Sequence, residues 1–96
     1  MNYYNDSIER LYETMLTLRN KEEMKAFFED ICTIKEIKSM AQRLDTAFLL
    51  SEKESYQKIT ETAEVSSATI SRVSRCLNYG SGGYAMAIER YKGTKE

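Results

Sequence analysis

The chain of 96 residues contains no proline and only four glycines, three of them clustered at Gly80, Gly82 and Gly83. Proline and glycine are the residues that most disfavour a helix interior. A chain almost free of them before residue 80 is therefore expected to be mostly helical. Its 42% hydrophobic and 30% charged residues also predict a folded chain, of one domain with a modest core.

Histidine is absent, and the two cysteines, Cys32 and Cys76, form no CxxC motif. Zinc sites usually draw several Cys or His ligands, so we expect no metal and two reduced, partly buried thiols. Nucleophilic catalysis lacks a histidine base, and no glycine-rich phosphate loop is present. These absences predict a protein that is not an enzyme and has no resident cofactor.

Long apolar runs are missing as well. No segment approaches the roughly 20 apolar residues of a membrane span. The polar residues 1–7 lack the apolar core of a signal peptide. We therefore expect a cytoplasmic protein without a membrane partner.

Residues 55–79 have the layout of a DNA-binding helix-turn-helix, with two short amphipathic helices joined by a tight turn. Apolar residues recur there at helical spacing, with one between the two helices. They are Ile59 and Ala63, Val65, and Ile70, Val73 and Leu77.

The outward face of the second helix carries short hydroxyl side chains followed by arginines. Such a helix can enter a major groove about 12 Å wide, where hydroxyl and guanidinium groups bond bases and phosphates. Thr69 is the leading candidate for base readout. The residues predicted to contact double-stranded DNA are Gln57, Lys58, Ser66, Ser67, Ala68, Thr69, Ser71, Arg72 and Arg75. Ser and Thr also cap helices, so an ordinary helix pair in a bundle is the competing interpretation.

The charge distribution gives evidence both for and against DNA binding. The net charge is only −1, which disfavours a nucleic-acid binder. Residues 1–64 hold 9 basic and 13 acidic residues, whereas residues 65–96 hold 5 and 2. The basic surplus thus begins at the expected recognition helix, and a local patch matters more than the total. Glu61 and Glu64 oppose DNA binding, and Glu64 would be strained if its turn position required a positive φ.

The residues before the helix-turn-helix predict three more helices. Asp6 or Ser7 can cap a helix that carries apolar residues from Ile8 to Leu18. Asn20 with Glu23 forms a capping-box pattern before a helix bearing Met24, Phe27, Phe28 and Ile31. These stripes exceed what a 96-residue monomer can easily bury, so residues 1–50 are predicted to form a homodimer.

A second capping box, Thr33 with Glu36, opens the longest helix, which should stop near Ser51. Its predicted buried side consists of Ile34, Ile37, Met40, Ala41, Leu44, Phe48 and Leu49. Ser55 is the expected cap of the next helix, and Gly80 the expected left-handed cap after the recognition helix. A last helix within residues 83–91 should bury Ala87, Ile88 and Tyr91, and residues 93–96 should fray.

Three blocks together resemble the small Trp-repressor-like proteins of bacteria, the YerC/YecD group. They are T-I-K-E-I-K-S-M-A-Q-R-L at 33–44, Y-Q-K-I at 56–59 and S-S-A-T-I-S-R-V-S-R-C-L-N-Y-G-S-G-G-Y at 66–84. The chain departs from the pattern in having Ile31 where the group has leucine. The resemblance implies an all-α fold of six helices, in which the N-terminal helices intertwine with a second subunit and the fourth and fifth read DNA.

The resemblance also implies where a corepressor would bind. Thr33, Arg43 and Arg72 match residues with which the tryptophan repressor holds tryptophan, the two arginines sandwiching the indole. Val73 replaces a glycine and Cys76 replaces a serine that helps to hold the amine. We expect Val73 to crowd such a pocket and Cys76 to be a poor partner for an ammonium group. Tryptophan is therefore a doubtful corepressor.

Two functions follow from these observations. The first is a homodimeric transcriptional regulator that binds a pseudo-palindromic operator. The second is a dimeric helical adaptor that keeps the helix-turn-helix as a scaffold and binds a protein. The basic surplus after residue 64 favours the regulator, whereas the overall charge and Glu64 favour the adaptor.

Overall fold

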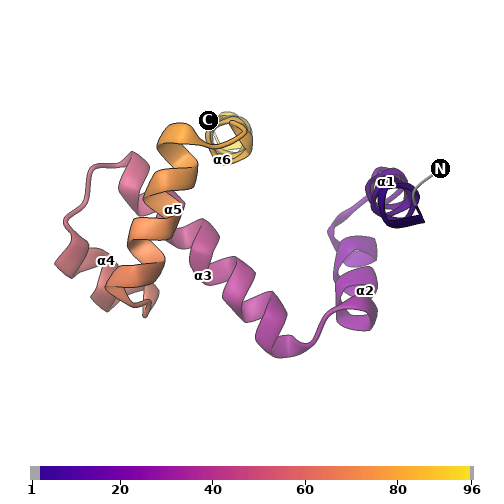
Figure 1. Cartoon of the computed structure of the whole chain (residues 1–96), viewed down its shortest axis with the longest axis horizontal. Helices are drawn as coiled ribbons and strands as arrows, with labels where there is room; N and C mark the ends of the chain where they lie inside the picture. The colour runs from indigo at the N-terminus through magenta and orange to yellow at the C-terminus, as the bar shows by residue number, and fades with distance from the viewer. Residues whose placement is uncertain (1–2, 96) are drawn as a thin grey trace. The chain divides into compact units, whose positions relative to one another are not determined.

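The computed structural model describes residues 3–95, which form six helices and no strand (Figure 1). The predicted all-α fold of six helices is confirmed. The helices are α1 (Tyr3–Met15), α2 (Lys21–Ile31), α3 (Ile34–Ser51), α4 (Tyr56–Ala63), α5 (Ser67–Tyr79) and α6 (Gly83–Thr94). None of the helices in residues 3–95 is both long and apolar enough to cross a bilayer. The chain divides into two compact units, Met1–Ile37 and Lys38–Glu96.

The first unit contains α1 and α2, whose boundaries follow partly from local capping. Asn20 Oδ1 accepts a hydrogen bond from the Glu23 N–H at 2.9 Å, as the capping pattern predicts. The prediction that Asp6 or Ser7 caps α1 is wrong, because α1 already begins at Tyr3. Residues 3–5 include no proline or glycine that would interrupt a helix. Asp6 lies in the first turn of α1, where an acidic group interacts favourably with the helix dipole. α1 ends at Met15, three residues before Leu18.

The first unit has no core of its own. None of the side chains of residues 4–37 is buried. Phe27 and Phe28 are half-buried and meet edge to face, with ring centroids 5.9 Å apart. Ile31 is 52% exposed, and it lines a hollow of about 380 Å³ between α1 and α2 together with Phe27 and Leu11. These apolar stripes are present as predicted, but the first unit covers them only in part.

The long helix α3 begins and ends where the sequence predicts. Thr33 Oγ1 accepts from the Glu36 N–H, and Glu36 Oε1 accepts from the Thr33 N–H, which completes the capping box. The predicted buried side is confirmed at Phe48 and Leu49, which pack half-buried against the core, but the fully buried residues of α3 are Thr46 and Ala47. Four members of the predicted side are exposed, namely Ile34, Met40, Ala41 and Leu44. The reason is that the core of the second unit packs on the C-terminal part of α3 alone.

The core of the second unit consists of two clusters joined by α3. In one, Ala47 packs with Val73 of α5 and Ile88 of α6. In the other, Ile59, Ala63 and Ile70 bring α4 and α5 together, and the half-buried Val65 packs against them at the turn. Leu50 of α3 contacts both clusters. The apolar spacing that predicts the helix-turn-helix is therefore also what attaches it to α3.

The connection between α5 and α6 differs from the prediction. Gly80 has φ −86° and ψ −155°, so it is extended rather than a left-handed cap. Glycine is still required there, because a Cβ would collide with the backbone carbonyl of Cys76. The left-handed residue is Gly82, at φ 85°. α6 continues to Thr94, so Gly93 is helical rather than frayed. Of the three residues predicted to be buried on α6, Ile88 is buried, whereas Ala87 and Tyr91 are exposed.

Candidate nucleic-acid interface

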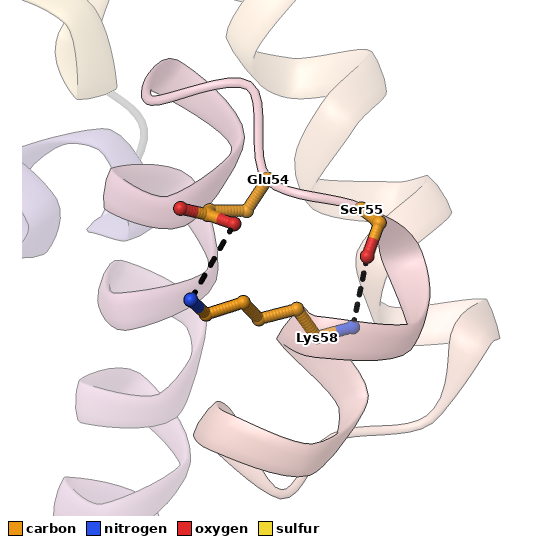
Figure 2. Close-up of polar contacts among 3 residues, drawn as sticks. All are labelled: Glu54, Ser55 and Lys58. Atoms are coloured by element: carbon orange, nitrogen blue, oxygen red, sulfur yellow. Dashed lines mark hydrogen bonds and ion pairs between the residues drawn. The ribbon is translucent and has the colours of Figure 1, made fainter.

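The first helix of the candidate interface, α4, begins at a side-chain cap. Ser55 Oγ accepts a hydrogen bond from the Lys58 N–H at 3.2 Å (Figure 2). The Lys58 side chain extends back along the loop, where its Nζ lies 3.8 Å from the Glu54 carboxylate. Gln57 Nε2 donates to Glu61 Oε1 at 3.4 Å. The two residues of α4 predicted to contact DNA are thus exposed but already interact with neighbouring carboxylates.

The turn between α4 and α5 has a left-handed residue that is not glycine. Glu64 has φ 57° and ψ 46°, a conformation that costs a residue with a Cβ about 1 kcal/mol. The positive φ considered for this position is confirmed. Gln42 of α3 donates from Nε2 to the Glu64 carbonyl at 3.4 Å. The turn is therefore joined to α3 by a side chain that sequence reasoning did not single out, since no local pattern marks it.

The second helix, α5, begins with the hydroxyl residues predicted for a recognition helix. Ser66 Oγ accepts from the Thr69 N–H at 3.2 Å and lies 3.2 Å from the Thr69 hydroxyl. Thr69 is half-buried and faces α3, whereas Ala68 and Ser71 are exposed. This placement differs from the expectation that Thr69 points away from the packed side. The predicted contact residues on α5 that are exposed are Ser67, Ala68, Ser71, Arg72 and Arg75.

A hollow of about 260 Å³ lies between α3, the turn and the start of α5. Arg43 of α3 and Arg72 of α5 both line it, so the fold brings together the two arginines that the resemblance pairs. The remaining lining residues are Ser39, Gln42, Glu64, Val65, Ser66 and Thr69. Two guanidinium groups among hydroxyl and amide groups can bind a small anion such as a carboxylate or a phosphate.

Of the other residues linked by resemblance to a corepressor site, Thr33 belongs to the first unit, where it caps α3. Val73 was expected to crowd a pocket, but its side chain is 1% exposed and packs in the core beside Ala47 and Ile88. Cys76 is an exposed free thiol, not the partly buried one expected, and Cys32 is half-buried. Within residues 3–95, no three His, Cys, Asp or Glu side chains are grouped as a metal site requires.

Comparison with known proteins assigns the family. The family model described as Trp repressor protein matches residues 6–92. The chain belongs to the Trp repressor family. It is 49% identical over 88 residues to the uncharacterised protein YerC of Bacillus subtilis (strain 168), covering 92% of this chain and 85% of the relative.

Two crystal structures have the fold described above. One is of a TrpR-like protein from Eubacterium eligens ATCC 27750, with 45% identity and a TM-score of 0.88, covering 91% of this chain and 90% of that one. The other is of a Staphylococcus aureus protein, with 39% identity and a TM-score of 0.87, covering 91% and 87%. The resemblance to the YerC group of the Trp repressor family is therefore confirmed.

Proposed function

We propose that this chain is a sequence-specific DNA-binding transcriptional regulator that acts as a homodimer on a pseudo-palindromic operator. The observation that supports it most is the exposed face at the start of α5. Ser67, Ala68 and Ser71 present short side chains there, and Arg72 and Arg75 follow on the next turn. A helix with this surface has the shape and donors that major-groove recognition needs. Membership of the Trp repressor family supports the same function.

The homodimer is supported by the lack of a core in the first unit. Residues 4–37 contain no buried side chain, although α1 and α2 both carry apolar stripes. Helices this short are marginal unless an apolar face is covered. A second copy of the chain would supply that cover and would place two recognition helices about 34 Å apart, one helical turn of DNA. The operator would then have two-fold symmetry.

The hollow beside Arg43 and Arg72 is the proposed place for any small ligand. Arg43 and Arg72 are the lining groups that suit an anion, whereas Glu64 opposes one. Tryptophan itself remains a doubtful corepressor because Cys76 is a poor partner for an ammonium group. We propose no catalytic role and a cytoplasmic site of action, where the DNA is.

An adaptor that binds protein through this surface is the second candidate. It is favoured by the acidic groups near the proposed DNA surface, since Glu61 and Glu64 are both exposed. Like charges facing phosphates weaken binding. This candidate predicts no affinity for duplex DNA even at low salt.

The deciding experiment combines genome-wide occupancy of the tagged protein with gel shifts on the sites recovered. The regulator predicts occupied pseudo-palindromes and a selected operator that is bound more tightly than random duplex. Ser71→Ala should weaken the selected operator while leaving random duplex unchanged, because it removes a group facing the bases. Arg72→Ala should weaken both and reduce the salt slope by about one. Wild-type protein that binds no duplex at low salt would establish the adaptor instead.

A further inference from the structure

The backbone carbonyl of Glu64 lies at the end of α4, in the turn of the helix-turn-helix. Glu64 is the C-cap of α4, where helix carbonyls lose their intrahelical partners. It also holds a left-handed conformation without being glycine. Without support, a turn of this kind would lower its free energy by relaxing to another backbone conformation. Something outside the turn must therefore favour the observed one.

Gln42 supplies that support from 22 residues away. Its side-chain amide donates to the Glu64 carbonyl at 3.4 Å, across the interface between α3 and the turn. Gln42 is half-buried, and its carbonyl accepts a hydrogen bond of 2.8 Å from the hydroxyl of the buried Thr46, one turn further along α3. The amide thus reaches the turn from a half-buried position on α3.

The conformation of Glu64 decides where α5 points. Ser66, the N-cap of α5, follows Glu64 by two residues, so a rotation of the Glu64 peptide moves the whole exposed face from Ser67 to Arg72. The apolar side chains of Val65 and Ile70 pack on the buried side of this region but cannot form a hydrogen bond there. The hydrogen bond from Gln42 is directional, and it joins α3 directly to the turn.

We propose that Gln42 is a positioning residue for DNA recognition, which fixes the orientation of α5 by holding the left-handed turn at Glu64. This inference rests on the proposed DNA-binding function. Gln42 acts through Glu64 and needs no contact with DNA. Its loss should therefore reduce discrimination between operator and random sequence more than it reduces electrostatic attachment, which depends on basic side chains elsewhere.

The test uses the full-length protein without added ligand, with a selected operator and a random duplex as probes. Gln42→Met has a similar length but no donor, and Gln42→Lys restores a donor. Ser51→Ala is the matched control, since Ser51 also makes a side-chain hydrogen bond on α3, to the Phe48 carbonyl, but lines no part of the hollow. A typical net hydrogen bond predicts that Gln42→Met lowers the operator-to-random affinity ratio about two- to tenfold. Gln42→Lys should recover the ratio, and Ser51→Ala should leave it unchanged.

Amide hydrogen exchange of the DNA-free protein gives a second readout. Gln42→Met should accelerate exchange at residues 65–69 relative to the wild type, whereas Ser51→Ala should not. If the wild type discriminates and Gln42→Met has the same ratio, the inference fails and the proposed function stands. An equal loss on both duplexes with a lower melting temperature would show a merely structural role and overturn it. A wild type that binds no duplex overturns the proposed function and this inference together.

Discussion

Thr33 and Glu36 exchange two hydrogen bonds at the start of α3. The Glu36 carboxylate accepts from the Thr33 N–H at 2.8 Å, and the Thr33 hydroxyl accepts from the Glu36 N–H at 3.1 Å. The backbone N–H of Thr33, followed by its hydroxyl, holds the pKa of Glu36 below the ordinary range of a glutamate. The start of the helix is therefore coupled to the charge of one exposed side chain.

This coupling predicts a dependence of α3 on pH. A depressed folded-state pKa means that the stabilisation is fully present above the unfolded pKa of a glutamate, about 4.3, and is lost as pH falls through the folded value. Carbon NMR titration of the Glu36 carboxyl should give a pKa below the usual one. Thr33→Ala should raise that pKa only in part, because the backbone donor remains. An ordinary pKa for Glu36 in the wild type would contradict the capping box in solution.

The burial of Val73 predicts a stability loss in Val73→Gly. Removing the side chain leaves a cavity beside Ala47 and Ile88, and glycine lowers helix propensity, which together should cost about 2–4 kcal/mol. Urea unfolding measures this change. Ser71→Gly, at an exposed position of the same helix, is the control for propensity and should cost about 0.5 kcal/mol. Equal losses in the two variants would show that Val73 is not a core residue.

The ion pair between Glu54 and Lys58 predicts that Glu54→Gln strengthens DNA binding. Lys58 Nζ lies 3.8 Å from the Glu54 carboxylate, which competes with a phosphate for the ammonium group. Neutralising Glu54 should improve affinity for random and selected duplexes alike, by about 0.2–1 kcal/mol at low salt. Gel shifts at several salt concentrations measure the change. Lys58→Gln should abolish the gain, and a gain that persists in the double variant would remove Lys58 as the contact.

The uncovered first unit predicts that Ile31→Asn breaks the homodimer. Ile31 is 52% exposed in one copy of the chain, so its replacement in a monomer should change stability by no more than about 0.5 kcal/mol. In a dimer that covers the hollow of α1 and α2, a polar residue there should shift sedimentation equilibrium towards monomer at micromolar concentration. Asp30→Asn creates the same residue at the adjacent exposed position and is the control. A folded wild-type monomer at that concentration would contradict the dimer.

Local sequence determined where four of the helices begin. Asn20, Thr33, Ser55 and Ser66 each accept from a backbone N–H three residues later, so their effect could be read from neighbouring letters. The spacing of Ile59, Ala63, Ile70 and Val73 likewise specified the helix-turn-helix, because one turn of helix relates each pair. Gly80 shows the limit of this reasoning. The sequence predicts that α5 ends at this glycine, but the conformation of Gly80 follows from its close approach to the Cys76 carbonyl.

Tertiary structure decided which surfaces these helices bury. The apolar stripe of α3 predicted burial at Leu44, but α5 and α6 cover Ala47 instead, because a stripe shows only that some partner is favoured. Val73 replaces a glycine of the resembling repressor, and only packing showed that it fills a core rather than a ligand pocket. The bond from Gln42 to Glu64 joins residues 22 apart. No periodicity encodes such a pair, since it depends on how α3 and the turn meet in space.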